Sequence, residues 1–137
     1  MDINSFTIES TRSAISQKEF TAADLAKNFY KKIEAEDPEI HAYLTLCEDR
    51  ALQQADRVDR IVKAGDPLPP LAGVPIGIKD VMVTKGVRTT AGSKILENFI
   101  PPYDCTAVAR LEAAGAMVPE TDARETANVR DTGVAAL

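Results

Sequence analysis

One lysine is placed where it could do acid–base chemistry. In the stretch LAGVPIGIKDVMVTKG, residues 71–86, Lys79 follows an alternating apolar pattern and precedes Asp80. Such alternation is typical of a strand, and Gly77 would leave space on the face that Lys79 shares. Ligands of open α/β sheets bind at the carboxyl ends of strands, and an amine held there with little water would favour its neutral form and could act as a base. The pattern alone favours the plainer alternative, a strand end that meets solvent.

The loop that follows carries several hydroxyl side chains. Gly92 and Ser93 could present backbone N–H groups to an anion or to the oxyanion of a reaction intermediate. A solvated loop explains the same residues and is favoured when the loop is considered alone. The hydroxyl residues are Thr84, Thr89, Thr90 and Ser93.

Other catalytic residue types are scarce. His41 is the only histidine, and its setting in DPEIHAYL predicts a loop or helix entry with a surface role. A multi-histidine metal site and a Ser–His–Asp triad are therefore hard to build from this sequence. The two cysteines, Cys47 and Cys105, have no metal-like spacing, so we expect reduced thiols.

The composition is that of an ordinary globular chain. Its 137 residues, 45% hydrophobic and 27% charged, are enough for one domain. The net charge of −5 argues against a basic nucleic-acid surface on this part of the protein, although a partner subunit could hold the nucleic acid. No leader pattern is present, and no apolar run approaches the roughly 20 residues that span a bilayer. We therefore expect a cytoplasmic protein with no membrane contact.

The first half of the sequence predicts helices that each bury one apolar face. Thr21 and Asp24 are spaced as a capping box. Pro38 is expected beyond the end of that helix, and Gly65 is expected to end the next one. The expected helices cover residues 7–16, 21–36 and 48–64.

The second half begins after a stiff connector. Residues 65–73 hold three prolines and two glycines, which excludes a helix or a central strand. A strand is expected over 74–83 and another over 116–118. A helix that Asp104 caps and that runs through Ala114 connects them, which makes one βαβ unit with parallel strands.

The predicted fold class is α/β, with N-terminal helices followed by the start of a parallel sheet. The sheet is incomplete in this chain, because a parallel pair buried on both faces needs more strands beside it. We therefore expect exposed apolar edges and a tendency to associate. Three segments are expected: a helical region at 1–66, the start of the α/β core at 67–118, and a divergent tail at 119–137 with no clear apolar period.

Long motifs in this sequence resemble the amidase signature family. The stretch 20–46 also fits the N-terminal region of that family. The resemblance covers about Ile8 to Val118 and, within the family, is greatest to the A subunits of glutamyl-tRNA(Gln) and aspartyl-tRNA(Asn) amidotransferases. The motifs are GVPIGIKD at 73–80, TTAGSKILENF at 89–99 and PYDCTAVARLEAAGA at 102–116.

The resemblance implies a Ser–cis-Ser–Lys triad in which Lys79 is the base. The lysine acts through a bridging serine to activate a serine nucleophile, and it can take a proton only when it is neutral. With the resemblance, a catalytic Lys79 is favoured over a solvent-facing strand end. The two serines of the family lie in a Gly/Ser-rich segment farther along, and the only Gly-Ser pair here, Gly92-Ser93, matches the upstream loop instead. We therefore expect these 137 residues to be inactive alone.

The tail departs from the family pattern. The family usually continues into a run like GKTNMDEFAMG, whereas this chain has PETDARETANV at 119–129. Pro119 is expected to interrupt the strand there. The tail is interpreted as that of a truncated or frame-shifted gene product.

The implied function is that of the N-terminal part of an A subunit that hydrolyses glutamine and supplies ammonia for amidation of a misacylated tRNA. The resemblance implies B and C subunits as partners, with the tRNA bound mainly through the partner subunit. It implies no cofactor in this chain, with ATP and Mg²⁺ used by the partner subunit. Two alternatives stay open: a stand-alone amidase of small amides and a catalytically inactive remnant. The stretch SKILENFIPPYDCTAV favours the tRNA enzyme.

Overall fold

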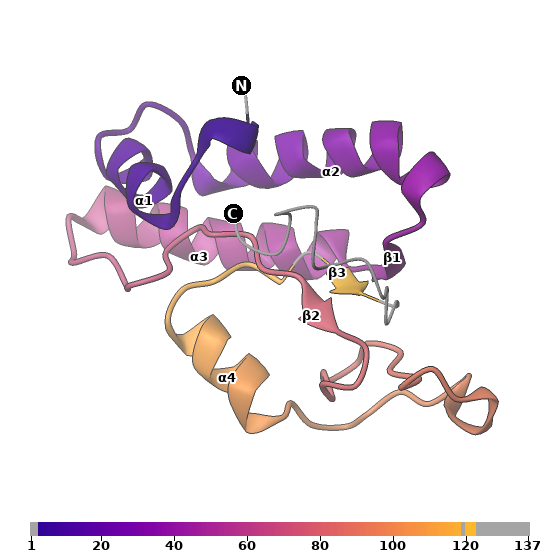
Figure 1. The fold of residues 1–137 in the computed structure, drawn as a ribbon. Helices are drawn as coiled ribbons and strands as arrows, with labels where there is room; N and C mark the ends of the chain where they lie inside the picture. Colours follow the sequence, from indigo (N-terminus) through magenta and orange to yellow (C-terminus); the bar gives the residue numbers. More distant parts are fainter. Residues whose placement is uncertain (1–2, 119, 123–137) are drawn as a thin grey trace.

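The computed structural model describes residues 3–118 and 120–122. Two long helices, α2 and α3, lie side by side, and a small sheet separates α3 from α4 (Figure 1). None of the described helices is long and apolar enough to cross a membrane. The helices are α1 (Ile8–Ser16), α2 (Ala22–Ile40), α3 (Glu48–Ala64) and α4 (Thr106–Ala113), with short 3-10 helices η1 (Ile3–Ser5) and η2 (Lys94–Leu96).

The three predicted N-terminal helices are present. The capping box of α2 is formed, because the Thr21 hydroxyl accepts from the Asp24 N–H at 3.0 Å and the Asp24 carboxylate accepts from the Thr21 N–H at 3.2 Å. The bounds of α3 are those the sequence predicts, and Gly65 ends it with a φ of 76°. The apolar period and the end signals were therefore sufficient to place α3 and the start of α2.

The prediction that Pro38 lies beyond α2 is wrong. Pro38 is inside the last turn of the helix, which ends at His41 with a left-handed φ of 54°. The Asp37 carbonyl accepts from the His41 N–H at 2.6 Å, and the Asp37 carboxylate accepts from the Ala42 N–H at 2.6 Å. These two bonds hold the turn, and a proline so near a helix end removes only its own N–H from the ladder.

The sheet is mixed rather than wholly parallel. Its strands lie in the order β1-β3-β2. β3 runs parallel to β2 and antiparallel to β1. The sequence did not predict β1, which has only four residues and therefore little alternation to detect. The strands are β1 (Tyr43–Leu46), β2 (Ile78–Lys79) and β3 (Glu120–Asp122).

The strand predicted over 74–83 is shorter in the structure. Only the two residues of β2 pair regularly, and Pro75 forms an isolated parallel bridge to Met117. Pro75 has no N–H to give to a ladder, which interrupts regular pairing at that point. Beyond Lys79 the chain turns, and the Met82 N–H donates to the Lys79 carbonyl at 2.8 Å.

The rest of the predicted βαβ unit also needs correction. The strand predicted over 116–118 contributes only the bridge at Met117, and the regular strand β3 follows it. Asp104 does not cap α4, which begins after Cys105 without a side-chain cap and ends one residue before Ala114. The Asp104 carboxylate instead accepts from the Lys85 N–H at 2.7 Å. Pro119 lies outside the described residues.

Helices α3 and α4 cover opposite faces of the segment before β3. Met117 belongs to the main apolar cluster, which includes Val58 of α3. Val118 packs instead with Ile78 of β2 and Val108 of α4. Neighbouring residues of an extended segment point to opposite faces. The segment carrying Lys79 and its parallel neighbour therefore form the middle layer of the molecule.

The proline-rich connector is held by close packing of backbone. The Gly73 N–H donates to the Gly115 carbonyl at 3.0 Å. A Cβ on Gly73 would lie 2.4 Å from Cδ1 of Ile15, and one on Gly115 would lie 3.0 Å from Cα of Ala72. Both glycines also have positive φ, 73° and 90°. The connector is thereby fixed against α1 immediately before the strand segment that ends in Lys79.

Candidate active site

Lys79 is the last residue of β2, and its side chain is exposed whereas that of Ile78 is buried. Its backbone is fixed on one side by parallel pairing with β3, where Lys79 lies opposite Asp122. Gly77 is exposed as well. Among the described residues, no hydrogen bond or ion pair engages the Lys79 amine. The described residues thus place the amine at the carboxyl end of a strand, in contact with solvent.

Asp80 points the other way, into the protein, and is only 4% exposed. Its carboxylate accepts from the Thr90 N–H at 2.8 Å, from the Thr90 hydroxyl, and from the Gly92 N–H at a long 3.4 Å. Its backbone carbonyl accepts from the Ala91 N–H at 3.3 Å. A buried carboxylate is tolerated only with such donors. Asp80 therefore anchors the loop at residues 90–92 to the strand end.

The N–H groups of Gly92 and Ser93, which were considered as possible donors to an anion, are used inside the protein. The Gly92 N–H donates to Asp80 and to the Thr90 hydroxyl oxygen, and the Ser93 N–H donates to the Thr90 carbonyl at 2.9 Å. The loop is therefore no anion cradle: the Asp80 carboxylate takes the place that an anion would occupy.

The favoured alternative, a solvated loop, is wrong for the three threonines of this segment, although several of its other residues are exposed. Thr84, Thr89 and Thr90 are 0%, 4% and 9% exposed. The Thr84 hydroxyl donates to the Met82 carbonyl at 3.0 Å, and the Thr89 hydroxyl donates to the Val87 carbonyl at 3.2 Å. A threonine that satisfies its hydroxyl on a nearby carbonyl can be buried at low cost, which the residue types alone did not reveal.

The remaining candidate residues have roles that do not involve Lys79. Ser93 caps η2, and its hydroxyl oxygen accepts from the Ile95 N–H at 3.3 Å. His41 is exposed at the end of α2, as its sequence setting predicted. Cys47 and Cys105 are half-buried and are not joined by a disulfide.

A second polar cluster joins α3 to α4. Arg50 pairs with Glu112 at 2.6 Å and with Asp104 at 3.1 Å, and it donates to the Lys85 carbonyl at 2.7 Å. Burial opposes the charged form of the guanidinium, but the bonds and charges of Glu112 and Asp104 outweigh it and raise the pKa of Arg50. The Gln54 amide nitrogen donates to Glu112 at 2.6 Å. Because the polar groups of this cluster are hydrogen-bonded to one another, the cluster acts as a structural link between α3 and α4.

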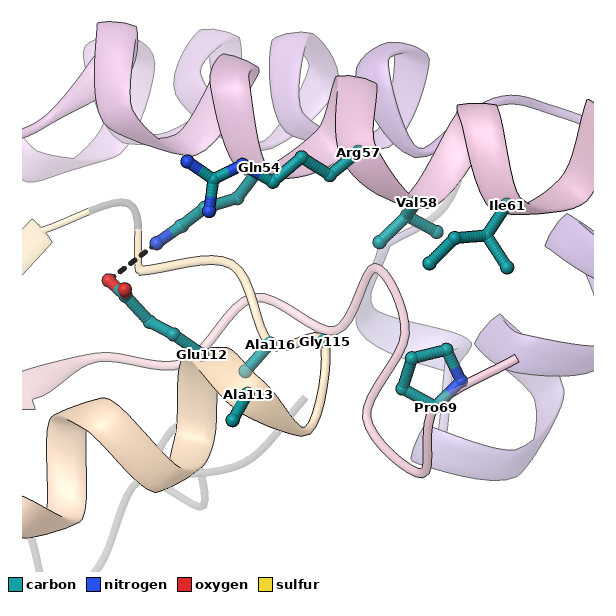
Figure 2. Close-up of a pocket in the computed structure, with 9 residues that line it drawn as sticks. All are labelled: Gln54, Arg57, Val58, Ile61, Pro69, Glu112, Ala113, Gly115 and Ala116. Atoms are coloured by element: carbon teal, nitrogen blue, oxygen red, sulfur yellow. Dashed lines mark hydrogen bonds between the residues drawn. The ribbon is translucent and has the colours of Figure 1, made fainter. Parts of the chain in front are cut away.

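A hollow of about 140 Å³ lies beside this link, between α3 and the turn that follows α4 (Figure 2). The bond from Gln54 to Glu112 closes one end, and the walls are otherwise mostly apolar. Lys79 does not line it. The described residues around the hollow include no serine, cysteine or lysine that could act as a nucleophile or base. Its lining residues are Gln54, Arg57, Val58, Ile61, Pro69, Glu112, Ala113, Gly115 and Ala116.

Sequence reasoning missed both polar groupings. The sequence indicates the pair of Asp80 and Thr90 only weakly, through an aspartate that follows a strand and two adjacent threonines about ten positions later. It indicates Arg50 and Gln54 more strongly, since residues four apart on a helix share a face, and these two flank the apolar stripe of α3. Neither indication identifies the partner, which lies on a different element.

Comparisons with known proteins agree on one family. A model of the family described as Amidase matches residues 24–133, which include all three motifs and part of the segment 119–137. The A subunit of glutamyl-tRNA(Gln) amidotransferase from Koribacter versatilis is 64% identical over 118 residues, which cover 86% of this chain and 25% of that protein. The protein of the same name from Geobacter metallireducens is 44% identical over 118 residues, with 86% and 24% covered.

A solved structure shows the same arrangement of elements. Native peptide amidase from Stenotrophomonas maltophilia superposes with a TM-score of 0.81 at 29% identity, covering 88% of this chain and 25% of the amidase. The chain therefore spans about a quarter of the length of the relatives that it matches.

Proposed function

The chain belongs to the amidase family, and on this premise we propose that it is the N-terminal part of the glutamine-hydrolysing A subunit of a glutamyl-tRNA(Gln) amidotransferase. The 64% identity to the Koribacter versatilis protein over 118 residues carries this proposal. The fold supports the amidase part of this proposal, since the helices and the small sheet superpose on a peptide amidase. In the proposed whole protein, β2 and β3 are the first parallel strands of a larger amidase-type sheet.

In this proposal Lys79 is the base of a Ser–cis-Ser–Lys triad. Acting through a bridging serine, it takes the proton of a serine that attacks the amide carbon of glutamine. The resulting tetrahedral intermediate breaks its C–N bond, ammonia leaves with the returned proton, and the acyl-enzyme that remains is hydrolysed by water. The position of Lys79 at the end of β2 supports the role, because that end of a parallel strand is where α/β proteins bind ligands. The exposed amine is open to further segments of the amidase fold that would carry the two serines and exclude water.

The proposed partners follow from the same relatives. B and C subunits would complete the complex, and the partner subunit would hold most of the tRNA and use ATP and Mg²⁺. The net charge of −5 is compatible with this division, because an acidic chain is a poor surface for a polyanion. The proposed location is the cytoplasm.

One other function has an observation in its favour. A stand-alone amidase of small amides is favoured by the superposition on a peptide amidase.

A hybrid protein tests the proposal. Residues 1–118 of this chain replace the matching quarter of the Koribacter versatilis protein, and ammonia release is measured with glutamine, with small amides and with a peptide amide. We expect glutamine to be preferred and Lys79→Ala to lower turnover by about 10²- to 10⁴-fold, the range for a lost acid–base group. Lys63→Ala, at an exposed lysine of α3, is the matched control and should leave turnover unchanged.

The outcomes separate the proposed function from that of a stand-alone amidase. Preference for small or peptide amides would favour the stand-alone amidase, and near-normal turnover in Lys79→Ala would remove the assignment of the base. The 137-residue chain by itself should release no ammonia above buffer, because triad members act as a unit. Turnover by that chain would show that it carries its own nucleophile.

A further inference from the structure

We propose that Asp80 is a positioning residue for Lys79: its buried carboxylate, anchored to the loop at residues 90–92, sets the direction in which the Lys79 amine points. The inference rests on the proposed function, in which that amine is the base. Nothing in the chemistry of the triad requires Asp80, which touches neither glutamine nor the serines in this proposal. Its role is carried by the geometry around the strand end.

The anchor has a backbone part and a side-chain part. The Asp80 carbonyl accepts from Ala91, and the carboxylate accepts from both the N–H and the hydroxyl of Thr90. The Thr90 hydroxyl oxygen in turn accepts from the Gly92 N–H at 3.2 Å. The bonds from Thr90 and Gly92 leave the Asp80 side chain little freedom to rotate, and the bond from Ala91 holds its backbone.

Asp80 directly follows Lys79 as the first residue of the turn after β2, so the bonds that hold Asp80 also hold the peptide unit between the two residues and thereby restrict the direction of Lys79. Asp80 is 4% exposed, whereas Lys79 is exposed. The Lys79 backbone is held from the other side by pairing with β3 and by the Met82 N–H, which donates to its carbonyl at 2.8 Å. Without the Asp80 anchor, the short ladder of β2 and the bond from Met82 would be left to resist rotation of the strand end.

A carboxylate suits this place better than other acceptors. It accepts without donating, so both oxygens can meet the N–H and O–H groups of the loop. An asparagine would direct an NH₂ group at one of these donors, and an alanine would leave the Thr90 N–H unsatisfied in a buried position. Thr90 is itself 9% exposed, so water is poorly placed to replace the lost acceptor.

The test uses the same hybrid protein, with kcat and KM for glutamine measured well below each variant's melting temperature. Asp80→Asn should lower kcat by about tenfold to a hundredfold, the scale that a small misplacement of a catalytic group can cost, with KM within about twofold. Thr90→Val removes the hydroxyl bond to Asp80 and the bond from the Gly92 N–H, keeps the bond from the Thr90 N–H, and should lower kcat by about three- to tenfold. Thr90→Ser keeps the hydroxyl and should restore kcat to within about twofold of the parent.

Thr89→Val is the matched control. Thr89 is a neighbouring buried threonine whose hydroxyl donates to the Val87 carbonyl instead of to Asp80. The change therefore removes a buried hydroxyl bond of the same loop, lowers the melting temperature as Thr90→Val does, and should leave kcat unchanged. If Asp80→Asn fails to fold, the comparison between the Thr90 and Thr89 variants still decides the question.

The outcomes of this inference and of the proposed function are distinguishable. If Lys79→Ala retains activity, the proposed base is wrong whatever the Asp80 variants do. If Lys79→Ala is inactive while Asp80→Asn and Thr90→Val lower only the melting temperature, Asp80 has a structural role and the positioning inference is overturned. An equal fall of kcat in Thr89→Val and Thr90→Val would overturn it as well, since the loop as a whole would then be responsible.

Discussion

At the scale of single residues, Gln54 shows how one buried amide joins three segments of the chain. It projects from α3 and is 6% exposed. Its nitrogen donates to Glu112 on α4 at 2.6 Å, and its oxygen accepts from the Val118 N–H, ahead of β3, at 2.7 Å. Val118 is fully buried, so water cannot replace Gln54 as the acceptor of its N–H. The Val118 N–H therefore depends on this side chain, whereas Glu112 is also paired with Arg50.

We expect Gln54→Leu to lower the free energy of unfolding of the 137-residue chain by about 1 to 3 kcal/mol, the cost of leaving a buried donor unsatisfied. Leucine has nearly the same volume, so packing is largely conserved. Urea unfolding followed by circular dichroism is the measurement. Gln53→Leu, the same change at the exposed neighbouring position, should stay within about 0.5 kcal/mol of the parent. Equal stability of both variants would show that Val118 and Glu112 find other partners.

Residues of the site could be predicted from the sequence only where their immediate sequence neighbours make them recognisable. Lys79 is such a residue, since a charge at the end of an apolar alternation is visible locally, and the structure places it at a strand end. Asp80 is different, because its partner Thr90 lies ten positions away and reaches it only through the course of the loop. The same holds for Gln54 and Arg50, whose partners are on another helix. Their burial depends on tertiary contacts that no local pattern encodes.

At the scale of secondary structure, helices were predictable and strands were not. The helices α1 to α3 follow from an apolar period and from caps within three residues of their ends, both local properties. The strands of this sheet have two to four residues, and each exists because of a partner distant in the sequence, as β1 pairs with β3. Pairing over such distances overrides local preference, which explains the corrections to the expected strands over 74–83 and 116–118.

The cap of α2 gives this helix a measurable response to acid. The side-chain bond from Thr21, and then the bond from its backbone N–H, lower the pKa of the Asp24 carboxyl. A lowered pKa in the folded state adds stability above the unfolded value of about 3.9, and this stability is lost as the pH falls through the folded value. Because Asp24 is exposed, solvent screens most of the charge effect and leaves the cap bonds as the larger contribution.

We therefore expect Thr21→Val to lower stability at pH 7 by about 1 kcal/mol, as for other lost N-caps. The variant should also raise the pKa of Asp24 towards its ordinary value, so that its stability changes less than that of the parent between neutral and acid pH. Urea unfolding at both pH values and a carboxyl-resolved NMR titration are the measurements. Thr21→Ser keeps the hydroxyl and should match the parent in both. An unchanged Asp24 titration in Thr21→Val would rule out the proposed cause.

At the scale of the whole molecule, the described residues leave an apolar surface on the segment between β2 and α4. Figure 1 shows this segment extending away from the paired helices. Ile95 is 95% exposed, Ile100 61% and Tyr103 59%. Single exposed apolar residues are ordinary. Several within nine positions are typical of a surface that another protein molecule or another segment covers. We refer to Ile95, Leu96, Phe99, Ile100 and Tyr103 as the apolar segment.

The last prediction concerns association through the apolar segment. In the 137-residue chain we expect concentration-dependent self-association, and the double change Ile95→Ser with Ile100→Ser should weaken it by roughly tenfold or more, because burying an isoleucine contributes about 1.5 to 3 kcal/mol. The free energy of unfolding should stay nearly constant, since both side chains are already in water in the monomer. Sedimentation velocity over a range of concentrations measures the association, and urea unfolding measures the stability. Ile40→Ser is the matched control, because Ile40 is 59% exposed but lies at the end of α2, outside the apolar segment. If Ile40→Ser weakens association as much as the double change does, general surface hydrophobicity is responsible and the apolar segment has no special part in it.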